Sequence, residues 1–86
     1  MKDWSELHQD VLKAERIADT IRPLLGGVEP EIQGAILAEL LSYWLAGHPD
    51  FAREPILAHH VRMVRELVGV SEKIMFGDDG HPGNQG

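Results

Sequence analysis

The chain has 86 residues, enough for one small domain, and its 43% hydrophobic and 26% charged residues are typical of a globular protein. The absence of cysteine excludes disulfides, thiolate metal sites and cysteine nucleophiles. A formal net charge of −6 disfavours non-specific binding to nucleic acid, because an acidic chain repels the phosphate backbone.

The first predicted helix covers residues 3–22. Asp3 is a suitable N-cap, and Glu6 three residues later resembles the second half of a capping box. Apolar residues then recur at spacings of three and four, which indicates an amphipathic helix. These residues are Trp4, Leu7, Val11, Ala14, Ala18 and Ile21. We expect Pro23 to end or kink the helix, and Gly26 and Gly27 to turn the chain.

The second predicted helix, residues 30–46, is apolar around most of its circumference. Pro30 suits its first position, where the missing N–H costs nothing. At about 100° per residue, the apolar arc spans roughly 220°. Its members are Ile32, Ile36, Leu37, Leu40, Leu41, Tyr43, Trp44 and Leu45. A helix of this kind is buried or covered by a partner. Within it, Gly34 predicts a close backbone approach, most simply to the first or third helix, and the Gln33 amide is expected to reach backbone or solvent.

The third predicted helix covers residues 55–68, with Pro55 at its start and Gly69 as its break. A short C-terminal turn over 71–76 follows, for which Ser71 is a suitable N-cap. Residues 77–86 hold four glycines and no apolar residue, which predicts a disordered tail. The predicted fold is therefore all-α: a small three-helix bundle forming a single helical domain over 1–76, followed by that tail.

The histidines are the residues best suited to bind a metal. His59 and His60 are adjacent and point about 100° apart on a helix, so they cannot both ligate one metal without distortion. Helical metal pairs use spacings of three or four, and neither histidine has a His, Asp or Glu partner there. We therefore predict no metal site and no cofactor, with His59 on the surface and His60 half-buried at an interface.

Catalysis has no support, since no catalytic constellation appears in the sequence, and we predict a non-enzymatic protein. We also expect a cytoplasmic location, because no signal peptide and no bilayer-spanning segment is evident.

Nucleic-acid binding has one feature in its favour, a local net charge of +1 over residues 53–73, but the predicted helices lack an exposed basic recognition face. An acidic regulator of a nucleic-acid process, acting through the third helix, and a histidine-based metal or small-molecule binder remain as alternatives.

The function that the sequence favours is protein–protein interaction. Two flanking helices cover most, but not all, of the apolar arc of the second helix, and aromatic residues with a polar atom are enriched at interfaces. The chain would then bind a second copy of itself, as a homodimer, or dock onto a larger protein as an accessory subunit, assembly factor or regulator. The candidate partner-binding residues are Trp4, Leu41, Tyr43, Trp44, His48, His59, Arg62 and Arg65.

Overall fold

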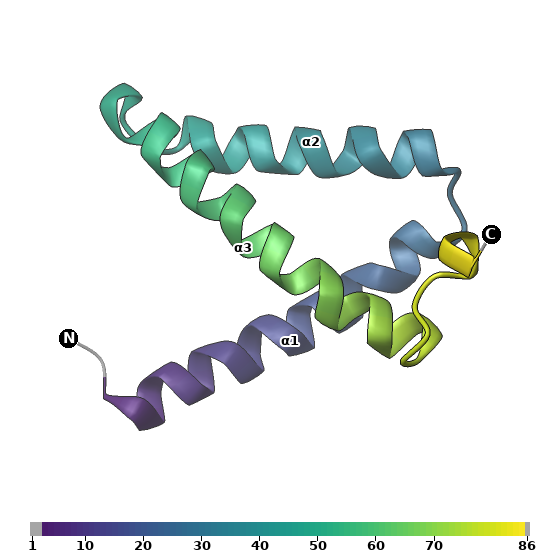
Figure 1. Ribbon diagram of the computed structural model, residues 1–86. Helices are drawn as coiled ribbons and strands as arrows, with labels where there is room; N and C mark the ends of the chain where they lie inside the picture. Colours follow the sequence, from purple (N-terminus) through teal and green to yellow (C-terminus); the bar gives the residue numbers. More distant parts are fainter. Residues whose placement is uncertain (1–2, 86) are drawn as a thin grey trace. The chain divides into compact units, whose positions relative to one another are not determined.

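The structure, a computed structural model, describes residues 3–85, and the regular structure in this range is helical throughout. It contains α1 (Trp4–Gly26), α2 (Pro30–Ala46), α3 (Asp50–Phe76) and a short 3₁₀ helix, η1 (Pro82–Gln85) (Figure 1). The predicted all-α class with three helices is confirmed. Within the described residues, no helix combines the length and apolar character needed to cross a bilayer. The chain divides into two compact units, Met1–Leu40 and Leu41–Gly86, and the boundary falls inside α2.

The first unit begins as predicted and differs at the end of α1. The Glu6 amide donates to Asp3 Oδ1 at 2.9 Å, so Asp3 caps the helix. The predicted end at residue 22 is wrong, because α1 continues through Pro23 to Gly26. Pro23 lies in the last turn, where its missing N–H removes a single hydrogen bond near a helix end. Gln33 Nε2 then donates to the Leu25 carbonyl at 2.7 Å, which confirms the predicted reach of the Gln33 amide to backbone.

In the second unit, α3 is much longer than the predicted helix over 55–68. It starts at Asp50 and ends at Phe76, so Pro55, Gly69 and Ser71 all lie inside it and the separate turn over 71–76 does not form. Pro55 removes one backbone hydrogen bond near the start of the helix, and Gly69 costs roughly 1 kcal/mol relative to alanine. Neither loss interrupts the hydrogen-bond ladder of a 27-residue helix.

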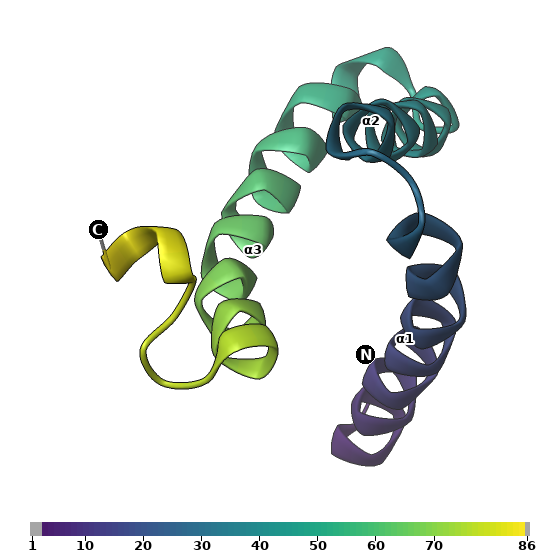
Figure 2. The same cartoon turned by 90° about the vertical axis from the view of Figure 1, so that its right-hand side faces the viewer.

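The segment after α3 is ordered over its described residues, whereas the sequence predicts a disordered tail. Gly77 and Gly80 adopt positive φ and turn the chain back, as Figure 2 shows. The Glu72 carboxylate accepts from the His81 amide at 3.1 Å and from Asn84 Nδ2 at 2.9 Å. Ring contact between His81 and Phe76, with centroids 4.9 Å apart, adds to this anchoring. Polar contacts to α3 therefore hold a segment that has no apolar residue of its own.

None of residues 3–84 is buried in the structure. The most buried positions are only half-buried, and they include Leu41, Leu45, Ile56 and Leu57. A Cβ built at Gly34 would meet no described heavy atom within 4 Å, so within its own unit the predicted close backbone approach of α1 is not formed. The three amphipathic or apolar helices thus leave most of their apolar side chains accessible.

Candidate functional site

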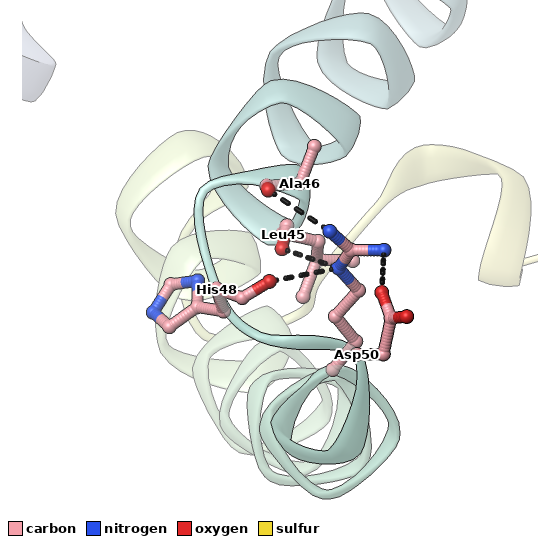
Figure 3. A network of polar contacts seen from close by, with 5 residues as sticks. Leu45, Ala46, His48 and Asp50 are labelled. Carbon is pink, nitrogen blue, oxygen red and sulfur yellow. Dashed lines mark hydrogen bonds and ion pairs between the residues drawn. The ribbon is translucent and has the colours of Figure 1, made fainter.

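The turn between α2 and α3 is fixed by one side chain, Arg53. Its Nε donates to the carbonyls of His48 at 2.9 Å and Leu45 at 3.2 Å, and one terminal nitrogen donates to the Ala46 carbonyl at 3.0 Å (Figure 3). The other terminal nitrogen lies 2.7 Å from the exposed Asp50 carboxylate. The last carbonyls of a helix have no partner within the helix, and they carry its negative dipole end. Arg53 therefore acts as the C-terminal cap of α2.

Trp44 directly precedes the capped carbonyls in the sequence and contacts two histidines. Its ring centroid is 5.3 Å from that of His48, nearly perpendicular, and 5.0 Å from that of His60 on α3. His48 Nδ1 is 2.8 Å from the Trp44 carbonyl oxygen. Because a carbonyl oxygen only accepts, Nδ1 must carry the proton, which leaves Nε2 of a neutral His48 as an acceptor. Both histidines thus pack against the indole with defined ring orientations.

These residues form one wall of a concave surface that we call the Trp44 groove. The groove has a volume of about 560 Å³, and Trp44, His48, Pro55, Ile56, His59, His60 and Met63 line it. No carboxylate or lysine is among these residues, so the lining is apolar and aromatic, with imidazole nitrogens and the Trp44 indole N–H as its side-chain polar groups. Such a surface favours an apolar or aromatic occupant oriented by a few hydrogen bonds.

Three of the predicted partner-binding residues, Trp44, His48 and His59, come together in this groove. The predicted accessibilities of the adjacent histidines are confirmed, with His59 exposed and His60 half-buried.

The other predicted residues lie elsewhere. Tyr43 is 73% exposed on α2 and Leu41 is half-buried, while Arg62 and Arg65 are exposed on α3 without lining the groove. Trp4, at the start of α1, belongs to the other unit and is 87% exposed.

Ile56, His60 and Met63 are not among the predicted site residues, although their spacing of four and three places them on one face of α3. Arg53 was expected only as part of the basic segment 53–73 and not as a cap. The available signal was the position of Arg53 after the helix-ending sequence Gly47-His48-Pro49, because basic residues favour helix C-termini.

Comparisons with protein families, with curated proteins and with solved structures find nothing that matches this chain. Among the residues that the structure describes, no three His, Cys, Asp or Glu side chains are grouped so that they could hold a metal ion. The exposed apolar side chains and the Trp44 groove are therefore the features of the molecule that bear on its function.

Proposed function

We propose that the chain acts by binding protein through the apolar faces of its helices and catalyses no reaction itself. The observation that carries this proposal is the absence of any buried residue over positions 3–84, together with the large number of exposed large hydrophobic side chains. Apolar patches that stay in contact with water are unfavourable, and on soluble proteins they mark interaction sites.

The surface of α2 supports the proposal most directly. Ile32, Leu37, Leu40 and Tyr43 are each about half exposed or more, although they belong to the most apolar helix of the chain. Complete burial of one such side chain stabilises by roughly 1.5–3 kcal/mol. A few of these residues in one interface would therefore supply a substantial part of a binding free energy.

The Trp44 groove adds a feature that a flat apolar face lacks. Trp44 is 46% exposed within a concave lining, and tryptophan is enriched among the residues that dominate binding energy at interfaces.

The nucleic-acid alternative is weaker, because Arg53, one of the basic residues that suggested it, is engaged by the carbonyls of α2. We place this activity in the cytoplasm, since a chain with no cysteine requires no oxidising compartment.

Site-specific photo-crosslinking of the full chain in cells tests the proposal. A photoreactive phenylalanine analogue replaces Leu40 or Tyr43, and Ala35 serves as the control, because it is exposed on α2 about 140° around the helix from Leu40. We expect protein adducts from Leu40 and Tyr43 and none from Ala35. Adducts with nucleic acid, or the absence of protein adducts at both apolar positions, would contradict the proposal.

A further inference from the structure

The segment over residues 77–85, which we call the C-terminal strap, folds back on the last turns of α3 and is held there by one carboxylate (Figure 2). Glu72 Oε2 accepts from the His81 backbone N–H at 3.1 Å and from Asn84 Nδ2 at 2.9 Å. Between positions 61 and 84, only Glu72 and Gly80 are half-buried, and every other residue is exposed. The best-covered contact in this part of the second unit is therefore a polar one, between α3 and the strap.

Two glycines allow the strap to follow the Glu72 carboxylate closely. Gly77 and Gly80 have φ of 84° and 75°, a backbone conformation that residues with a Cβ rarely adopt. A Cβ built at Gly80 would lie 3.3 Å from both Cδ and Oε2 of Glu72, which is tighter than an ordinary contact. Within the strap, the Gly83 amide donates to His81 Nδ1 at 2.8 Å. The strap is therefore shaped around Glu72 and is closed by a hydrogen bond of its own.

The strap also forms one wall of a second groove, which lies on α3 and has a volume of about 400 Å³. The groove is mainly apolar and is lined by Val64, Leu67, Val68, Ser71, Glu72, Met75, Phe76 and His81. Among these lining residues, His81 alone comes from the strap, and its ring centroid lies 4.9 Å from that of Phe76, nearly perpendicular. If the strap leaves Glu72, the groove loses this wall and the Phe76 ring loses its cover.

We infer that the C-terminal strap is a latch that opens and closes on α3, and that the Glu72 carboxylate holds it closed. Water can replace each of the polar contacts, because Glu72 is only half-buried and both His81 and Asn84 are exposed. The strap also contains no apolar residue that would hold it against α3. Segments with few buried apolar contacts and accessible hydrogen bonds open locally at a small cost in free energy.

Opening and closing of the strap changes the surface at the end of α3. The second groove, with His81 as a wall, exists only in the closed state, whereas the open state uncovers the Phe76 ring. A molecule that contacts His81 in the groove favours the closed state, and one that needs the uncovered Phe76 favours the open state, each according to its difference in affinity. The strap therefore regulates how much apolar surface the end of α3 presents.

Amide hydrogen exchange of the full chain, followed by NMR, tests the latch. The His81 and Gly83 amides of the unmodified chain should exchange about tenfold more slowly than those of an unstructured peptide, as expected for a closed state that opens readily. Glu72→Ala should bring both amides to within about twofold of the unstructured rate. In the same variant, the chemical shifts of the His81 ring protons should move to unstructured values, because the ring leaves Phe76. Gly80→Ala should act in the same way from the strap side, since its Cβ would press on the Glu72 carboxylate.

Glu66→Ala and Gly69→Ala are the matched controls, and circular dichroism verifies the helicity of every variant. Glu66→Ala removes another carboxylate of α3 at an exposed position, and Gly69→Ala adds a Cβ that meets no described heavy atom within 4 Å. Neither control should change the exchange of the His81 and Gly83 amides or the His81 ring shifts.

Three results would overturn the inference. Exchange at the unstructured rate in the unmodified chain would show that the strap is not closed. Protection above about a thousandfold would show a fixed segment that does not open readily. Protection that survives in both Glu72→Ala and Gly80→Ala, or that is lost equally in the two controls, would show that the Glu72 carboxylate is not what holds the strap.

Discussion

Replacing Arg53 by alanine should destabilise the second unit by about 2–3 kcal/mol. Each hydrogen bond from a charged donor contributes roughly 1.5–3 kcal/mol at most, and Arg53 makes three of them to the carbonyls of Leu45, Ala46 and His48. The Arg53 side chain is 41% exposed, so water replaces part of these bonds and the loss falls well below their sum. Urea unfolding followed by circular dichroism at fixed chain concentration measures the effect.

Two control variants distinguish the loss of the α2 cap from the loss of the Asp50 ion pair and from the loss of any exposed arginine. Asp50→Ala removes only the ion pair, and because Asp50 is 93% exposed we expect a loss below about 0.5 kcal/mol. Arg62→Ala removes an exposed arginine from the same helix and should be equally mild. If Arg53→Ala unfolds with the same free energy as Arg62→Ala, or if Asp50→Ala costs as much as Arg53→Ala, the assignment of Arg53 as the cap of α2 is refuted.

Four further predictions follow from the described contacts. Trp44→Ala should cost about 2 kcal/mol in urea unfolding and not the 3–5 kcal/mol typical of a core aromatic, because Trp44 is 46% exposed; a loss above 4 kcal/mol would contradict this exposure. Gly34→Ala should stabilise by about 0.5–1 kcal/mol in thermal melts, since a Cβ there meets open space, and destabilisation would reveal a close approach at that point. Glu72→Ala should speed hydrogen exchange of the His81 amide, whereas unchanged exchange would show that the segment is held by other contacts. In ¹⁵N NMR at a pH where His48 is neutral, His48 should carry its proton on Nδ1; an Nε2–H tautomer would contradict its bond to the Trp44 carbonyl.

Capping residues and prolines predicted the starts of α1 and α2 correctly, because at these positions the residue type suits the first turn of a helix better than any other place in it. Asp3 caps α1 and Pro30 opens α2, as their chemistry dictates. The same reasoning failed at Pro23 and Pro55, because a proline near a helix end removes only one hydrogen bond and its neighbours can still hold the helix. The predicted helix break at Gly69 was wrong for a similar reason. The free-energy cost of one glycine in a helix is small compared with the total stabilisation of a 27-residue helix.

The remaining differences depend on pairs of residues that are separated along the chain. Composition indicated that residues 77–86 lack apolar side chains, but it could not show that Glu72 would accept hydrogen bonds from His81 and Asn84. Likewise, the apolar and aromatic character of α2 was sufficient to predict Trp44 as a site residue. The contact of Trp44 with His60 could not be predicted, because it depends on the direction that α3 takes after the α2–α3 turn. The spacing of side chains along a helix predicts which residues share a face of that helix. Which residues of two helices touch depends on how the two helices are placed, and spacing alone does not give this.

The Arg53 cap has a consequence for the order of folding. Its three carbonyl partners lie only five to eight residues away in sequence, so closing this turn costs little chain entropy. Contacts this local form on the microsecond scale, well before contacts that join distant segments or separate molecules. The α2–α3 turn, with Trp44 and His48 beside it, is therefore formed before any partner arrives. An association at the neighbouring groove would then join surfaces that are already shaped, and its rate would be set by encounter and not by the folding of the turn.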